Sequence, residues 1–136
     1  MNEASFIGLF AATVSFGALL YLAALGELFS EKVGILNFGV EGMMAVGAVT
    51  AFMVAMETGN PWIALVAAVA AGAMFASLHG LFTVVLGAAQ VVSGLSLTIL
   101  VIGLAAYLGK GYVGRPSGAE LTPVDWGGLS SLRWGG

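Results

Sequence analysis

Long apolar stretches separated by short polar clusters run along the chain. The first apolar stretch, residues 4–26, contains no charged side chain. A polar cluster follows at residues 27–32, and a second apolar stretch runs over residues 33–56, interrupted by Asn37 and Glu41. A helix needs about 20 mostly apolar residues to cross the hydrocarbon core of a bilayer. Each of the two stretches therefore predicts one transmembrane helix.

The second half of the chain predicts two more spans. Residues 58–109 carry no charge and would make a helix roughly twice the length that a bilayer requires. Residues 57–61 read as a turn before this stretch, and the small and polar residues 87–90 mark a break within it. We therefore expect an all-α, multi-pass transmembrane bundle of about four spans, near residues 4–26, 33–56, 61–86 and 91–109. Residues 110–136, which hold most of the basic side chains, are expected to be an extramembrane loop or tail.

Composition supports the membrane assignment. The 136 residues are 60% hydrophobic and 8% charged, whereas a soluble domain carries about 25% charged residues. A cleaved signal peptide is the alternative for the first stretch, but such peptides begin with basic residues and this chain begins Met1-Asn2-Glu3. The chain has no cysteine, which excludes disulfides and thiolate metal sites. The chain lacks the interleaved basic and aromatic residues that are typical of nucleic-acid binding.

Small residues recur at every fourth position of the third span. The row consists of Ala64, Ala68, Gly72, Ala76 and Gly80. Small side chains let transmembrane helices approach closely, because lipid provides no hydrophobic force that draws helices together. The row predicts packing against other helices, within this chain or beyond it.

The polar positions of the second span are candidates for a substrate pathway or gate. Asn37 and Glu41 are four residues apart, so both would project from one face of a helix. Gly39 and Gly42 flank Glu41, and such glycine-rich, polar helix starts are typical of the broken helices of transporters. The alternative is that Glu41 lies near the interface and caps the helix or pairs with Lys32.

His79, Gln90 and Ser93 are further pathway candidates in the third and fourth spans. A lone histidine or hydroxyl in a span usually forms hydrogen bonds to its own or a neighbouring helix, and this alternative stays open. Ser93 and His79 would suit a nucleophile and its base, but no local motif supports that pairing. Metal-ligand and phosphate-binding motifs are also missing. We expect a protein that is not an enzyme.

Three stretches resemble one family of membrane proteins. Residues 26–44, with the sequence GELFSEKVGILNFGVEGMM, resemble the signature of ABC-transporter permeases of the branched-chain amino acid, ribose and nucleoside import type. The Glu-Gly-Met-Met variant is similar to the simple-sugar and nucleoside branch. Residues 59–62 and 90–95 agree with it, so the resemblance covers essentially the whole chain.

The resemblance implies a transporter subunit without its own cofactor. A cytoplasmic ABC ATPase would use the ATP, a second permease subunit would complete the pore, and an extracytoplasmic binding protein would deliver a nucleoside or simple sugar. The location would be a bacterial-type plasma membrane. Residues 1–109 would be the N-terminal half of the family domain, in a fragment, a truncated product or a piece of a split subunit. The alternative function is a membrane scaffold or half-permease that binds a partner without moving solute.

The two indicators of orientation disagree. The resemblance places residues 27–32 in the cytoplasm and the segment after the fourth span outside. Counting of positive charges weakly favours a cytoplasmic tail, because Lys110, Arg115 and Arg133 stand against Lys32. We follow the resemblance.

Overall fold

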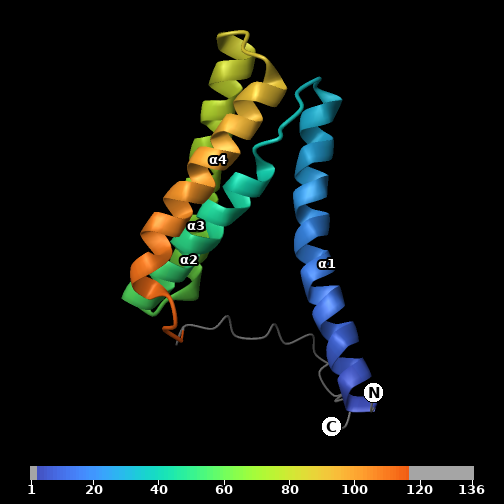
Figure 1. Cartoon of the computed structure of the whole chain (residues 1–136), viewed down its shortest axis with the longest axis vertical. Helices are drawn as coiled ribbons and strands as arrows, with labels where there is room; N and C mark the ends of the chain where they lie inside the picture. Colours follow the sequence, from blue (N-terminus) through green and yellow to red (C-terminus); the bar gives the residue numbers. More distant parts are fainter. Residues whose placement is uncertain (1–2, 117–136) are drawn as a thin grey trace.

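The computed structural model describes residues 3–116, which form four long helices and two short helical extensions (Figure 1). The long helices are α1 (Glu3–Lys32), α2 (Val40–Thr58), α3 (Pro61–Gly80) and α4 (Gln90–Gly109). A π-helix, η1 (Leu81–Val85), continues α3, and a 3₁₀ turn, η2 (Lys110–Tyr112), continues α4. Most of the expected tail, residues 117–136, lies outside the described residues.

All four long helices have the length and apolar composition to cross a membrane. The expected all-α bundle of four spans is therefore confirmed. The third and fourth spans begin and end close to their expected positions, at residues 61–85 and 90–112. The first two differ: α1 continues through the polar residues 27–32, and α2 begins at Val40 instead of near residue 33.

The turn between α2 and α3 explains why that boundary can be read from the sequence. Gly59 ends α2 with a φ of +64°, and its amide donates to the carbonyl oxygen of Ala55 at 2.9 Å. Asn60 caps α3, because its Oδ1 accepts from the amides of Trp62 (2.9 Å) and Ile63 (3.4 Å). Pro61 occupies the first helical position, where its missing N–H costs nothing.

The packed part of the molecule is formed by α2, α3 and α4. Helix α2 packs against both of the others, while α3 and α4 make few contacts with each other. Val46, Phe75, Leu97 and Val101 form the buried apolar cluster between them. Because α2 lies between α3 and α4, the chain that enters its first turn can contact all three helices.

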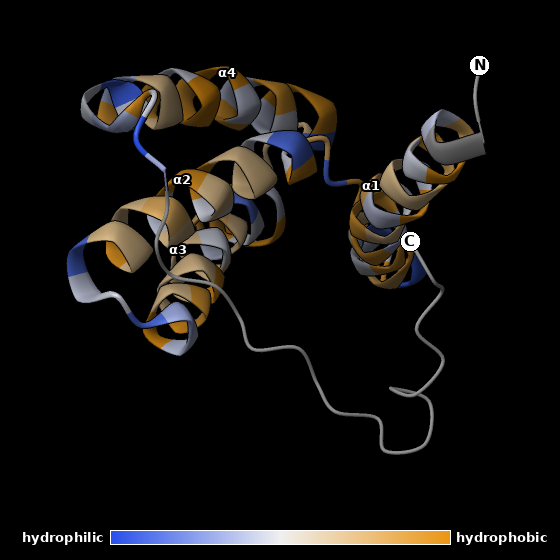
Figure 2. Ribbon diagram, turned by 90° about the horizontal axis from the view of Figure 1, so that it is seen from below, coloured by the Kyte–Doolittle hydropathy of each residue, from blue (hydrophilic) through white to orange (hydrophobic). Residues whose placement is uncertain are grey.

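Helix α1 stands apart from this packed unit in both views (Figures 1 and 2). None of its most apolar stretch is buried, and its large side chains are exposed around the helix. A helix that is hydrophobic all round belongs in lipid or among other helices. In a bilayer, most of the α1 surface is therefore available to lipid or to further helices.

The row of small residues on α3 faces α2 only at its beginning. Ala64 is buried, and the carbonyl oxygen of Ala68 lies 3.6 Å from where a Cβ on Gly47 would be. Ala76 is exposed, and a Cβ on Gly72 or Gly80 would meet nothing within 4 Å in the described chain. Packing through those later positions stays a prediction that concerns other helices.

Candidate functional site

The candidate site is the irregular segment between α1 and α2, residues 33–39, with the side chains that hold it. It begins at a Schellman motif that ends α1. The amide of Gly34 donates to the carbonyl oxygen of Glu31 (2.9 Å), and that of Ile35 to Ser30 (3.0 Å). Gly34 has a φ of +83°, which glycine adopts without strain. The chain then leaves α1 and runs toward the first turn of α2 (Figure 1).

Side chains of two other elements bond the middle of the segment. Gln90, the first residue of α4, donates from Nε2 to the carbonyl oxygen of Gly34 (3.1 Å) and accepts at Oε1 from the amide of Leu36 (2.8 Å). Glu27 of α1 accepts at Oε1 from the amide of Asn37 (2.7 Å). The Gln90 amide thus supplies one donor and one acceptor, as a neighbouring strand would.

His79 holds the same segment from α3. Its side chain is buried, with 2% of its surface exposed, and its Nε2 lies 3.3 Å from the carbonyl oxygen of Leu36. A carbonyl oxygen only accepts, so Nε2 carries the proton of this bond. In the neutral ring, Nδ1 then accepts from the Ser93 hydroxyl, 3.1 Å away. The structure therefore brings three of the candidates, His79, Gln90 and Ser93, together around the segment that contains Asn37.

The last part of the segment leads directly into α2. Thr98 of α4 donates from Oγ1 to the carbonyl oxygen of Phe38 (2.8 Å). Asn37 Oδ1 accepts from the amide of Gly39 (3.0 Å), which forms a local turn of the kind that asparagine favours. Because α2 begins only at Val40, the expectation that Asn37 and Glu41 share one face of a helix is wrong.

These bonds satisfy backbone groups of a non-helical segment that connects two helices able to span a membrane. Irregular backbone at membrane depth is tolerated only where it is buried in protein or lines a water-filled cavity, since each unsatisfied polar group costs several kcal/mol. Here side chains of α1, α3 and α4 supply the partners that a helix would otherwise provide. The fold therefore holds this non-helical segment in place with specific hydrogen bonds.

Glu41 lies outside this hydrogen-bond network. Its side chain is exposed in the first turn of α2. A carboxylate in that position interacts favourably with the helix dipole, typically by about 0.3–1 kcal/mol at the surface. Whether Glu41 also takes part in a substrate pathway stays a prediction.

Two glycines, Gly42 and Gly94, let α2 and the segment approach α4 closely. A Cβ on Gly94 would lie 2.8 Å from the amide nitrogen of Phe38, and one on Gly42 would lie 2.9 Å from the Cα of Thr98. Real Cβ atoms do not approach backbone atoms so closely, so these two contacts require glycine. A Cβ on Gly39 would lie 2.9 Å from Oδ1 of Asn37, a side-chain atom that can move aside.

Sequence reasoning missed Glu27, Gly94 and Thr98 as parts of the site. The polar cluster that contains Glu27 reads as a loop, although Gly34 is the available signal for a helix that ends later. Gly94 lies within residues 90–95, which resemble the family, but nothing local marks it as a contact, and Thr98 resembles any other hydroxyl residue in a span. Their importance comes from the backbone that lies opposite them.

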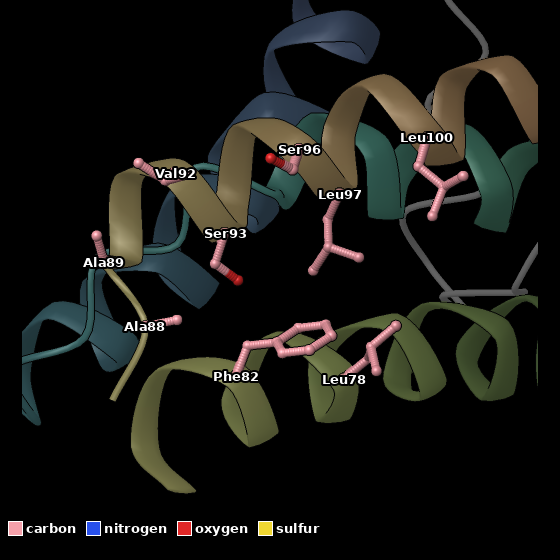
Figure 3. Close-up of a pocket in the computed structure, with 9 residues that line it drawn as sticks. All are labelled: Leu78, Phe82, Ala88, Ala89, Val92, Ser93, Ser96, Leu97 and Leu100. Atoms are coloured by element: carbon pink, nitrogen blue, oxygen red, sulfur yellow. The ribbon is translucent and has the colours of Figure 1, made fainter. Parts of the chain in front are cut away.

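An apolar pocket of about 450 Å³ opens between α4 and the end of α3 with η1 (Figure 3). Phe82 and Leu78 line one side, and Leu97 lies across from them. Ser93 and Ser96 are its hydroxyl-bearing residues, and the Ser93 oxygen points into the space. The pocket thus adjoins the His79–Ser93 hydrogen bond that supports the segment.

Residues 9–131 match the family of permease components of branched-chain amino acid transport systems. The match extends over most of the 136 residues. The chain belongs to this permease family.

Three relatives of this permease chain carry names from sugar and nucleoside transport. It is 46% identical over 106 residues to TsgC13 of Haloferax volcanii, named as a putative glucose ABC transporter permease. It is 37% identical over 110 residues to the guanosine permease NupQ of Bacillus subtilis, and 35% identical over 95 residues to the nucleoside permease NupC of Lactococcus lactis.

The alignments cover 78%, 76% and 65% of this chain, but only 32%, 34% and 30% of the three relatives. The permease chain thus spans about a third of the length of the relatives it matches. No solved structure matches it.

Proposed function

We propose that the chain provides four transmembrane helices of a permease subunit in an ABC importer for a nucleoside or simple sugar. Membership of the permease family and the names of the three relatives support this function. A cytoplasmic ATPase would supply the energy, a second permease subunit would complete the pathway, and an extracytoplasmic binding protein would deliver the substrate. The location would be a bacterial-type plasma membrane.

The irregular segment 33–39 is the observation that carries the proposal. It interrupts the apolar part of the chain at a point where three helices converge on it, and its partners Glu27, His79 and Gln90 come from all three of them. Transporters use such non-helical backbone at substrate and gating positions, where it is buried in protein or lines a cavity. In this proposal the candidates Asn37, Gly39, Glu41 and Gly42 lie along the pathway.

Purification of the tagged chain from its native membrane tests the proposal. We expect an ABC ATPase and a second permease subunit to co-purify with it. In liposomes with the binding protein, glucose or a nucleoside should stimulate ATP hydrolysis by the complex. Failure of every sugar and nucleoside tried to stimulate hydrolysis would contradict the proposal. A cross-linked membrane partner, with uptake unchanged when the gene is deleted, would instead support the scaffold alternative.

A further inference from the structure

A small cleft lies between α1 and the segment 33–39, away from the apolar pocket of Figure 3. Its volume is about 260 Å³, and its polar lining comes from Glu27 and Glu31 of α1 and from Asn37. Pockets for drug-sized ligands run from about 300 to 1,000 Å³. This cleft therefore suits a single small ring better than a larger molecule.

The cleft has hydrogen-bonding capacity that the described chain does not use. Glu27 Oε1 accepts from the amide of Asn37, but Oε2 of the same carboxylate is buried without a hydrogen-bond partner among the described residues. A buried acceptor without a donor is destabilising, and more so when it is charged. Asn37 Nδ2 contacts the Sδ of Met43 at 3.6 Å, and a thioether is a weak acceptor. The lining residues thus hold an unpaired carboxylate oxygen and an amide donor whose acceptor is weak.

An aromatic ring and a second carboxylate complete the lining. Phe38 borders the cleft with half of its surface exposed. Glu31 follows Glu27 by four residues on α1, so both carboxylates lie on the same face of the helix. Ligand sites typically combine apolar surface with a few placed polar groups. A ring with hydroxyl groups on its edge and carbon atoms on its face matches this combination.

We propose that this cleft binds the hydroxyl-bearing sugar ring of the transported molecule. The carboxylates of Glu27 and Glu31 accept from ring hydroxyls, Asn37 Nδ2 donates, and Phe38 packs against the carbon face. The inference rests on the proposed function and narrows it, because glucose is such a ring and guanosine carries one. A single cleft then serves both kinds of substrate named among the relatives, with a nucleobase extending out of it.

Protection of a cysteine from alkylation tests this site. The chain has no native cysteine, so Ala24→Cys places a single thiol in the lining of the cleft. In lipid nanodiscs, guanosine and glucose should slow its reaction with N-ethylmaleimide several-fold. 2′,3′-Dideoxyguanosine, which lacks two ring hydroxyls, should protect much less. A control thiol from Ala12→Cys, elsewhere on α1, should react at the same rate with and without each compound.

Variants of the lining separate ligand binding from damage to the fold. Glu27→Gln keeps the Oε1 that accepts from Asn37 but removes the carboxylate, so the protection of Ala24→Cys by guanosine should be lost. Phe38→Leu keeps apolar volume without the aromatic ring and should reduce protection.

Equal protection by guanosine and its dideoxy analogue, protection that survives Glu27→Gln, or no protection by any probe would overturn the site. A complex that shows substrate-stimulated ATP hydrolysis without protection would refute the cleft alone. Absence of both the stimulated ATP hydrolysis and the protection from alkylation would refute the proposed function as well.

Discussion

Three polar side chains of α3 and α4 bond to backbone groups of one segment. Gln90, His79 and Thr98 each reach a carbonyl oxygen or amide of residues 34–38, from positions far away in the sequence. The contact between His79 and Ser93 has the spacing of a nucleophile and its base, but the other ring nitrogen is bonded to a backbone carbonyl. At the scale of residues, these polar groups therefore act together, because all of them hold an irregular chain inside a bundle.

His79 is the most buried member of this set, and its replacement gives the first prediction. His79→Ala removes the donor to the Leu36 carbonyl oxygen and should cost about 1–3 kcal/mol of unfolding free energy, the cost of an unsatisfied buried group. His79→Gln places an N–H near the position of Nε2 and should retain part of the unfolding free energy that His79→Ala loses. Reversible unfolding in mixed detergent micelles measures both. Ser77→Ala is the control, because the Ser77 hydroxyl bonds only within its own helix, to Ala73. Equal stability of His79→Ala and Ser77→Ala would contradict the prediction.

Gly94 gives a second prediction at the residue scale. A Cβ there would lie 2.8 Å from the Phe38 amide nitrogen and 3.0 Å from that of Gly39, so Gly94→Ala must displace the segment or α4. We expect a loss of about 1–3 kcal/mol, as for other overpacked sites. Gly103→Ala, in the same helix, meets nothing within 4 Å and should be neutral or stabilising by up to about 1 kcal/mol. Thermal unfolding of the two variants side by side tests this difference, and a stable Gly94→Ala would refute it.

At the scale of elements, hydropathy and turn residues predicted the number of spans and the positions of the last two. Asn60 and Gly87 mark their turns with local chemistry, and local chemistry is visible in a sequence. The start of α2 was not predictable in this way, because residues 33–36 are apolar and resemble a helix that has already begun. Gln90 and Thr98 satisfy that backbone from 54 and 60 residues away. Only a three-dimensional arrangement reveals such partners.

The cap of α3 gives a prediction about a single element. Asn60→Ala removes the Oδ1 that accepts from the amides of Trp62 and Ile63, and a lost cap costs typically about 1 kcal/mol. The first turn should fray, so these two amides should exchange with deuterium several-fold faster. Amides near Phe75, a buried residue about three turns further along α3, should be unaffected. Asn60→Asp retains an acceptor and should preserve protection, and a comparable loss of protection in both variants would argue against capping.

At the scale of the whole molecule, α1 is joined to the packed unit mainly through the segment 33–39. Helices α2, α3 and α4 bury side chains among themselves, whereas the apolar side chains of α1 stay exposed. The ribbon of α1 stands apart from the other three helices (Figure 2). The hydrogen bond between Glu27 and the Asn37 amide connects α1 to the segment. A shift of α1 would therefore act first on the segment and on the cleft beside it, which couples the outer helix to the proposed pathway.

The two ends of the molecule make the membrane orientation testable. Lys110 and Arg115 follow α4 at one end, and Lys32 closes α1 at the other. Charge counting would place the α4 end in the cytoplasm, but it rests on very few residues. We expect the opposite orientation, as the resemblance of residues 26–44 to ABC permeases indicates. A membrane-impermeant maleimide should then label Gly111→Cys in intact cells and Ala88→Cys only after permeabilisation. Both positions are exposed, so their intrinsic reactivity in detergent serves as the control. The reverse pattern would show that the positive charges decide the orientation, and the segment 33–39 would then open toward the outside of the cell.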